Sequence, residues 1–392
     1  MHAPIFVINA GSSSIKFAIY ATGEERSVEA VFDGEISSIG ASPQLKVKSA
    51  SGETLEKRPA SAADHKEAIA EIFAWVSGRL GAEVTFDGVG HRVVHGGERY
   101  SAPVLIDAQA LDALNDLIPY APLHQPHNVA GIRAVCTTAP GLRQVACFDT
   151  AFHQSQSALA YTFALPREFA AKGLRRYGFH GLSYEYVASR LEQLGEAQGK
   201  IIVAHLGNGA SLCAIENGVS VASTMGFSTL DGLIMGTRPG NLDPGVVLHL
   251  LREEGMTTEE VSTLLYNRSG LLGLSGISSD MRILLESDDP AARQAVDLFV
   301  YRIAREVGSL AAAMGGLDRI VFTGGIGENA PEIRKRVSLL AAWLGFDLDP
   351  EANLRNASCI SKPRSAKSLW VIPTDENLMI ARHTRRILDS LR

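Results

Sequence analysis

The chain of 392 residues is poor in cysteine and carries no excess of positive charge. Its four cysteines, Cys136, Cys147, Cys213 and Cys359, are widely spaced and form no C-x-x-C pair. This spacing argues against a disulfide framework or a zinc site, and it predicts buried thiols in a reducing compartment, most simply the cytoplasm. The formal net charge of −6 provides no attraction to nucleic acid or to an anionic membrane.

Long apolar runs are also missing. No segment approaches the roughly 18 uninterrupted apolar residues of a membrane helix. Residues 1–4 lead into the apolar run Ile5–Ile8 without a basic segment or a cleavage signal, so no targeting segment is expected. No linker rich in proline, serine or charge divides the chain, and domain boundaries must come from the pattern of elements.

The common nucleotide-binding signatures are absent too. There is no G-x-x-x-x-G-K-[ST], no G-x-G-x-x-G after a strand and no Asp-Phe-Gly, and His91-Arg92 is not followed by the aspartate of a protein-kinase catalytic loop. P-loop, Rossmann and protein-kinase sites are therefore unsupported. Phosphate chemistry in this chain would need another fold.

The composition that is present, 46% hydrophobic and 20% charged, suits a globular protein of two or three domains. Apolar spacing predicts helices from about Asp64 to Leu80 and from Pro290 to Met314. Two short strands are expected before residue 50, and a helix closes the chain. Other apolar runs predict strands at 6–8, 15–20, 89–94, 145–148, 201–204, 211–215, 319–322 and 369–372.

A plan of strand, small-residue turn and strand occurs twice, at 6–20 and at 201–215. Asn9-Ala10-Gly11-Ser12 aligns with His205-Leu206-Gly207-Asn208. This indicates a weak internal duplication, although a chance likeness between two hairpins stays open. Hairpins mixed with βα units predict an α/β fold in two similar halves with a cleft between them.

Three turns of small residues each follow an apolar strand: Gly11–Ser14, Gly207–Gly209 and Gly324–Gly327. Such turns let backbone N–H groups approach phosphate oxygens closely. One glycine-rich turn alone is more often only a tight turn, but three in these positions favour a phosphate-binding function.

Ten short motifs lie in order along nearly the whole chain. They are Asn9–Phe17, Gly90–Glu98, Ala121–His124, Phe148–His153, Arg176–Gly181, His205–Ser211, Met235–Arg238, Ser278–Arg282, Gly325–Asn329 and Thr374–Glu376. Jointly they closely resemble the motifs of the acetate kinase family, within the acetate and sugar kinase/Hsp70/actin superfamily. The resemblance implies two duplicated actin-like (ribonuclease H-like) α/β domains with a nucleotide cleft between them. We expect residues 1–150 to form the first domain, residues 151–377 the nucleotide-binding domain, and a helix at about 378–392 to pack back on the first.

The activity implied by the resemblance is reversible, direct in-line transfer of the γ-phosphoryl group of ATP to acetate, giving acetyl phosphate and ADP. It would depend on Mg²⁺, for which Mn²⁺ can substitute, in a cytoplasmic homodimer. Acetate is already ionised at neutral pH, because carboxyl pKa values are about 4, so the acceptor needs no general base. The difficulty is repulsion between two anions, which positioned cations relieve.

Four catalytic residues are implied by the resemblance. Arg92 would bind the acetate carboxylate as a bidentate pair, and Arg238 would hold the transferring phosphoryl group. His180 would donate a hydrogen bond to the equatorial phosphoryl oxygens. Asp149 is commonly described as a proton donor or acceptor in the family; since acetate has no proton to lose, we expect it to orient Arg92 or a water on Mg²⁺. Taken alone, each of these residues would have an ordinary structural explanation.

The remaining contacts are also implied by the resemblance. Asn9 and Glu376 match the metal positions, and Val94, Leu123 and Phe179 would line a small pocket for the acetate methyl group. The segments 280–282 and 325–329 are expected at the adenosine end of the nucleotide. The full set of expected nucleotide contacts is Ser12, Lys16, His205, Leu206, Gly207, Asn208, Gly209, Asp280, Met281, Arg282, Gly325, Ile326, Gly327, Glu328 and Asn329.

Three positions depart from the family pattern: Thr229 stands where proline is common, Pro239 where serine or cysteine is, and Tyr184 where histidine is. They leave the acyl-chain preference open, since one methylene is worth only about 1–3 kcal/mol of discrimination. A propionate or butyrate kinase of the same family is therefore an alternative. A second alternative is a non-catalytic, ATP-switched binding protein on the same fold, which would not need all four catalytic residues.

Overall fold

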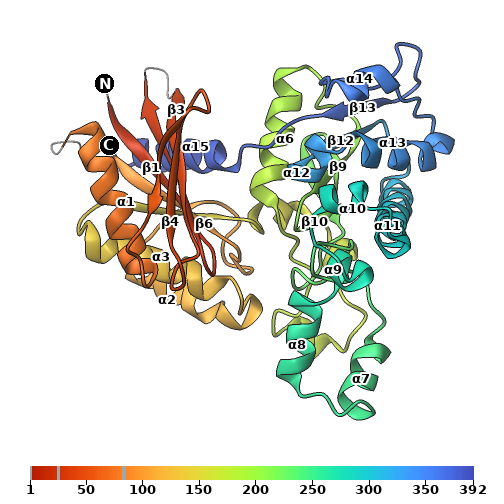
Figure 1. Cartoon of the computed structure of the whole chain (residues 1–392), viewed down its shortest axis with the longest axis horizontal. Helices are drawn as coiled ribbons and strands as arrows, with labels where there is room; N and C mark the ends of the chain where they lie inside the picture. The colour runs from red at the N-terminus through yellow and green to blue at the C-terminus, as the bar shows by residue number, and fades with distance from the viewer. Residues whose placement is uncertain (1, 24–26, 82–84) are drawn as a thin grey trace. The chain divides into compact units, whose positions relative to one another are not determined.

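The computed structural model describes residues 2–23, 27–81 and 85–392. They form two compact units, the first of Met1–Phe152 with Asp375–Arg392 and the second of His153–Thr374 (Figure 1). Each unit is built around one β-sheet. No helix of the described residues is long and apolar enough to cross a membrane.

The sheet of the first unit has eight strands in the order β5-β4-β3-β2-β1-β6-β8-β7. β3 and β4 are the two strands predicted before residue 50, whereas β5 and β7 were not predicted. The bounds are β1 His2–Ala10, β2 Ile15–Thr22, β3 Val28–Ser37, β4 Gln44–Ser49, β5 Thr54–Pro59, β6 Gly88–Val93, β7 Val104–Leu105 and β8 Gln144–Phe148.

The sheet of the second unit has five strands in the order β11-β10-β9-β12-β13. They are β9 Lys200–Leu206, β10 Ala210–Glu216, β11 Val219–Ser223, β12 Arg319–Thr323 and β13 Ser368–Val371. In both units the first strand pairs antiparallel with the next one and parallel with a later one, so β3-β2-β1-β6-β8 matches β11-β10-β9-β12-β13. This repeated pairing confirms the predicted duplication and the α/β fold.

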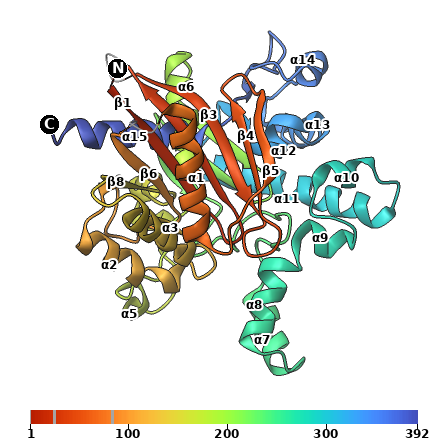
Figure 2. The same cartoon turned by 60° about the vertical axis from the view of Figure 1, so that its left-hand side comes forward.

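Helices cover both faces of the first sheet. Val89 of β6 joins an apolar cluster with Ile72 of α1 and Val135 of α3. The next residue, Gly90, faces α15, where a Cβ on the glycine would lie 2.5 Å from Ile380 Cγ2. Since successive residues of a strand point to opposite faces, α1 and α3 cover one face and α15 covers the other (Figure 2). The helices of this unit are α1 His65–Leu80, α2 Ala108–Asp116, α3 Gln125–Thr138 and α15 Glu376–Asp389, with 3₁₀ turns at Ile118–Tyr120 and at Ala151–Ser155, where the chain leaves the unit.

In the second unit, α6 and α11 lie on opposite sides of the sheet (Figure 1). The predicted helix Pro290–Met314 is confirmed as α11, which buries one apolar stripe and ends at Gly315. The other helices are α4 Ala158–Tyr161, α5 Arg167–Ala170, α6 Gly181–Gln193, α7 Pro244–Arg252, α8 Thr258–Asn267, α9 Gly270–Ser275, α10 Met281–Glu286, α12 Gly324–Asn329, α13 Pro331–Leu340 and α14 Pro350–Leu354, with a 3₁₀ turn at Ala342–Leu344.

Local signals explain where α1 begins and ends. Asp64 accepts a hydrogen bond from the backbone N–H of Glu67 at 2.9 Å, as the predicted N-cap requires. The Glu67 carboxylate reaches back to the N–H of Ala63 at 2.8 Å. Gly81 ends the helix with φ 99°, a conformation that favours glycine.

Two expectations are wrong. Gly324–Gly327 is not a turn but the start of α12, because Gly324 takes φ 75° and directs the chain from β12 straight into a helix. Cys136 and Cys359 are exposed rather than buried, whereas Cys147 and Cys213 are buried as expected. Cys136 lies on the solvent side of α3, where the apolar face of the helix does not reach.

Replacing Gly90 with alanine should destabilise the first unit by about 1–3 kcal/mol, because the new methyl group would overlap the helix that covers the sheet. Its Cβ would lie 2.3 Å from Thr384 Oγ1 and 2.5 Å from Ile380 Cγ2. Urea unfolding followed by circular dichroism measures the change.

Gly78→Ala is the matched control, because Gly78 is exposed on α1 and has no atom within 4 Å of the added Cβ. It should stabilise the protein by roughly 0.5–1 kcal/mol through helix propensity. Equal unfolding midpoints for the two variants would contradict the packing of α15 on β6.

Candidate active site

Polar side chains gather where three parallel strands of the first unit end. β1 pairs with β6 through Ile8 and His91, and β6 pairs with β8 through Val93 and Phe148. Asn9, Arg92 and Asp149 therefore lie at the carboxyl ends of three adjacent strands. This edge is where ligands bind in open α/β sheets.

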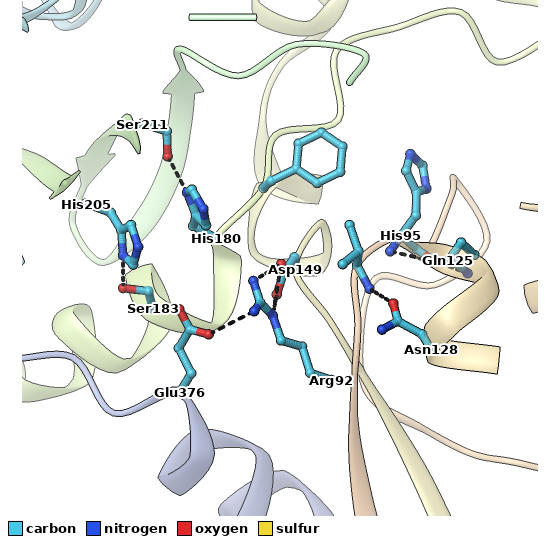
Figure 3. A network of polar contacts seen from close by, with 12 residues as sticks. Arg92, His95, Gln125, Asn128, Asp149, His180, Ser183, His205, Ser211 and Glu376 are labelled. Atoms are coloured by element: carbon cyan, nitrogen blue, oxygen red, sulfur yellow. Dashed lines mark hydrogen bonds and ion pairs between the residues drawn. The ribbon is translucent and has the colours of Figure 1, made fainter. Parts of the chain in front are cut away.

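Arg92 forms a two-pronged ion pair with Asp149, to which it donates from Nε at 3.0 Å and from Nη2 at 2.7 Å (Figure 3). Glu376, at the start of α15, lies 3.7 Å from Nη1 of the same guanidinium. Burial alone would lower the pKa of Arg92, but the two carboxylates raise it above its ordinary value. Arg92 is thus held charged and oriented, and Nη1 is the guanidinium nitrogen for which no bond to Asp149 is found.

Two buried amides fix the backbone beside this edge, and they were not predicted from the sequence. Asn128 accepts from the N–H of Val94 and donates to the carbonyl of Ala10, both at 2.9 Å. Gln125 binds both backbone groups of His95 at 3.2 Å. Both amides come from α3, where they are 3% and 0% exposed. One signal in the sequence could have found them. Gln125 and Asn128 are polar residues three positions apart on what would be the apolar face of a helix, and polar groups in such a place must find hydrogen-bond partners.

The other predicted residues of the first unit lie at its surface or just behind the strand ends. Val94 is 6% exposed and Leu123 is 41% exposed. The turn after β1 is closed by a hydrogen bond from Gly11 N to Ser14 O at 2.8 Å, and Ser12 is exposed within it. Lys16, also exposed, pairs with Asn9 across β1 and β2.

A cavity of about 470 Å³ in the second unit brings the three predicted nucleotide segments together. Its volume lies in the range of about 300–1,000 Å³ that is usual for small-molecule sites. The sequence analysis missed two of its residues, Ser279 and Ala330. The lining residues are Gly207, Asn208, Ser279, Asp280, Met281, Arg282, Gly325, Ile326, Asn329 and Ala330.

Other predicted nucleotide residues do not line this cavity. Leu206 is fully buried, and His205 turns its ring toward α6. The Glu328 carboxylate accepts hydrogen bonds from the N–H of Gly324 at 2.8 Å and of Thr374 at 3.1 Å, so it holds the start of α12 from within the unit. Gly327 is also buried.

His180 and Arg238 converge on the turn after β9. A Cβ placed on Gly209 would lie 3.0 Å from Nη2 of Arg238 and 3.2 Å from Nε2 of His180. Only glycine leaves this space open. Both predicted catalytic groups of the second unit therefore face one small volume beside the turn that also lines the cavity.

The His180 side chain is fixed by the backbone conformation of its residue and by two contacts of its ring. The residue takes the left-handed conformation, φ 59°, at the start of α6. Its Nδ1 lies 2.8 Å from Ser211 Oγ, and its ring stacks on that of His205 with 4.3 Å between centroids (Figure 3). His205 is in turn fixed by Ser183, 2.8 Å from its Nδ1. Such strained and over-determined conformations often occur at functional sites.

Arg238 is held by a carbonyl group and not by a carboxylate. Its Nη1 donates to the backbone oxygen of Thr229 at 2.8 Å. Burial lowers the pKa of Arg238 below its ordinary value, and the nearby Tyr266 hydroxyl opposes this only in part. No carboxylate of the described residues forms an ion pair with it, so the site can accept an anion.

Phe179, the third predicted pocket residue, is 1% exposed and lies next to His180. Its carbonyl accepts a hydrogen bond from Nε2 of His153 at 2.9 Å. Burial lowers the pKa of His153 to about 4, so this histidine is neutral at physiological pH. The contact fixes the backbone that carries His180.

Comparison with known proteins gives one consistent result. A chain described as acetate kinase from Rhodopseudomonas palustris (strain TIE-1) is 54% identical over 392 residues, which cover 98% of both chains. One from Methylocella silvestris is 50% identical over 399 residues, covering 99% of this chain and 98% of that protein.

Solved structures agree with these matches. Acetate kinase from Porphyromonas gingivalis superposes with a TM-score of 0.89 at 38% identity, covering 98% of this chain and 100% of that chain. A propionate kinase from Francisella tularensis superposes with a TM-score of 0.91 at 36% identity, covering 97% and 98%. The sequence model of the acetokinase family matches residues 4–382, and the chain belongs to that family.

Proposed function

We propose that this enzyme transfers the γ-phosphoryl group of ATP to acetate, giving acetyl phosphate and ADP, reversibly and by direct in-line attack. The observation that carries the proposal is the convergence of Arg238 and His180 over Gly209. Arg238 and His180 can both donate hydrogen bonds, and no carboxylate of the described residues forms an ion pair with the arginine. Such a pair of donors suits a transferring phosphoryl group, whose charge spreads over its equatorial oxygens. Because ATP is the donor, we place the reaction in the cytoplasm.

The nucleotide would occupy the cavity of the second unit. Gly207 and Asn208 line it together with residues at the start of α10 and along α12. The phosphates would then extend along the Gly207–Gly209 turn, where backbone N–H groups and the Arg238 guanidinium can bind them. Asp280–Arg282 and Gly325–Asn329 would hold the adenosine end.

In the first unit we assign acetate to Arg92. Its Nε and Nη2 are engaged by Asp149, so the acceptor carboxylate would meet the end of the guanidinium. This geometry supports Asp149 as the group that orients Arg92. A general base is unnecessary, because acetate enters the reaction as an anion.

A divalent cation would be held by Asn9 and Glu376, with Mg²⁺ the preferred ion. Amide and carboxylate oxygens are ligands that Mg²⁺ accepts, and it keeps several waters when phosphates complete its shell. Among the residues described, no cluster of three or more His, Cys, Asp or Glu side chains is placed to hold a metal. When bound, the ion would supply charge neutralisation at the nucleotide phosphates; Mn²⁺ can replace it.

Acetate is the acceptor we favour, because the relatives at 50–54% identity are described as acetate kinases. Propionate is the second candidate, since a propionate kinase superposes as well as an acetate kinase does. A small apolar pocket distinguishes the two acids only weakly, by about 1–3 kcal/mol per methylene.

Purified protein with Mg-ATP should produce acyl phosphate that hydroxylamine traps as the hydroxamate, with acetate giving more product than propionate or butyrate. Arg238→Ala should lower kcat by at least about 100-fold, and Arg238→Lys, which keeps the charge but not the planar fork, by less. Arg305→Ala is the control, because Arg305 is 45% exposed in a surface ion pair. Tight ATP binding without hydroxamate from any short acid would refute the kinase proposal.

Asp149→Asn should lower kcat/KM for acetate by roughly 10–100-fold, because the neutral amide no longer fixes the Arg92 guanidinium. If Asp149 acts through Arg92, the double variant Arg92→Ala with Asp149→Asn should be no worse than Arg92→Ala alone. Steady-state kinetics of the three variants measures this coupling. Losses that multiply would show that Asp149 acts independently of Arg92 and would contradict the orienting role.

We also propose that the enzyme is a homodimer that uses α7. None of the α7 residues is buried within the unit, and Val246 and Leu248 are 42% and 46% exposed. Both views show α7 and α8 projecting from the rest of their unit (Figures 1 and 2). A second copy of the chain would cover this apolar helix.

The double variant Val246→Glu with Leu248→Glu should elute as a monomer, whereas the wild type should have the mass of a dimer in light scattering after size exclusion. Charged side chains at an apolar interface cost several kcal/mol when they lose water without a partner, by an order-of-magnitude estimate. Leu194→Glu is the control, since Leu194 is also 46% exposed but follows α6. A monomeric wild type, or a dimeric double variant, would contradict the assignment.

A further inference from the structure

A chain of hydrogen bonds leads from His180 into the interior of the second unit. Nδ1 of His180 lies 2.8 Å from Ser211 Oγ, and the same Oγ is in short contact with the hydroxyl of Tyr184. Tyr184 follows His180 by one turn of α6, and Ser211 comes from β10. Tyr184 and Ser211 are both fully buried, so water does not compete for these bonds.

The chemistry of the three groups gives the chain a direction. Each hydroxyl has one proton to donate, while an imidazole nitrogen without a proton accepts. A phenol is the more acidic donor, with a pKa of about 10, so Tyr184 donates to Ser211 in preference to the reverse. The Ser211 proton is then directed at Nδ1 of His180, which leaves the imidazole proton on Nε2.

A guanidinium and a second imidazole ring are near neighbours of His180. Arg238 converges on the same point over Gly209, and the ring of His205 stacks on His180 at 4.3 Å. His153, on the chain segment before α6, contacts the backbone of Phe179 and is itself neutral because of burial. A second positive charge beside the guanidinium is costly. A neutral imidazole carries a proton on only one of its two nitrogens. The neutral ring can therefore donate from Nε2 only if Nδ1 has no proton and accepts a hydrogen bond.

We propose that Tyr184 is a positioning residue that acts through Ser211 to fix His180 in the tautomer that carries its proton on Nε2. Nε2 is the nitrogen that lies toward Gly209, 3.2 Å from a Cβ placed on that glycine. The tautomer itself follows from this unit alone, whereas its consequence for catalysis rests on the proposed function. A fixed Nε2–H is a ready donor to an anionic oxygen at any pH at which the ring is neutral.

Long-range ¹H–¹⁵N correlation spectra of the full chain, labelled with ¹⁵N-histidine, report the tautomer directly. The His180 signal is assigned from its loss in His180→Gln. At about pH 8, where an ordinary imidazole is neutral, the wild type should show a protonated Nε2 and an unprotonated Nδ1 at His180. Tyr184→Phe, and independently Ser211→Ala, should shift the His180 nitrogens toward a mixture of tautomers. Tyr301→Phe is the control, because Tyr301 is 56% exposed on α11.

Kinetics tests the consequence. Tyr184→Phe should lower kcat by about tenfold with little change in KM for ATP, as expected when one transition-state donor is weakened.

The outcomes separate the two claims. A His180 proton on Nδ1 in the wild type, or an unchanged His180 spectrum in both Tyr184→Phe and Ser211→Ala, would overturn the inference. A shifted tautomer in a wild-type chain that makes no acyl phosphate would support the hydrogen-bond chain and refute the proposed function.

Discussion

An arginine that meets an anionic substrate must keep its charge and its orientation while the protein shields it from water. The two central arginines of this chain satisfy that constraint in opposite ways. Arg92 is paired with Asp149 and approached by Glu376, and its pKa is raised. Arg238 is held by a carbonyl oxygen, and burial lowers its pKa. Each arrangement follows from the place of the arginine in the fold. Arg92 lies at the end of a strand beside two carboxylates, whereas Arg238 lies in a loop where a backbone carbonyl group accepts its hydrogen bond.

This difference separates the two tasks. A guanidinium whose charge is already balanced binds a further carboxylate weakly, and its contribution is to orient that carboxylate. A guanidinium without a carboxylate partner gains most from an anion of high charge, such as a phosphoryl group in transfer. In the proposed reaction, positioning and neutralisation would thus fall to different residues, which suits an acceptor that needs no activation and an obstacle that is repulsion.

Patterns that are local in the sequence predicted local structure well. The helix Pro290–Met314 and the N-cap Asp64 follow from apolar spacing and capping chemistry, and both are confirmed. The nucleotide segments were placed by motif resemblance, and the cavity brings three of them together. Their roles stay predictions. Gly324–Gly327 was misassigned because a glycine-rich run is equally compatible with a turn and with a sharp entry into a helix.

Contacts between distant segments could not be predicted in the same way. Arg92 and Asp149 are 57 positions apart, and Asn128 joins Ala10 across 118 positions. Such pairs depend on strand order, which single-sequence patterns do not specify. The amides of Asn128 and Gln125 look like ordinary helix residues until α3 is packed on the sheet. Only burial makes their hydrogen bonds necessary.

The duplication gives two similar sheets whose strand ends carry different residues. β1-β2 and β9-β10 are equivalent hairpins with the same pairing to their neighbours. In the first unit the strand ends carry Asn9, Arg92 and Asp149, whereas in the second Gly207 and Asn208, which follow β9, line a cavity. We expect the sheets to stabilise both units, and under the proposed function the residues beyond the strand ends would carry the chemistry. A substitution within the shared strands should therefore affect folding most, while one at these ends should affect substrate binding or phosphoryl transfer most.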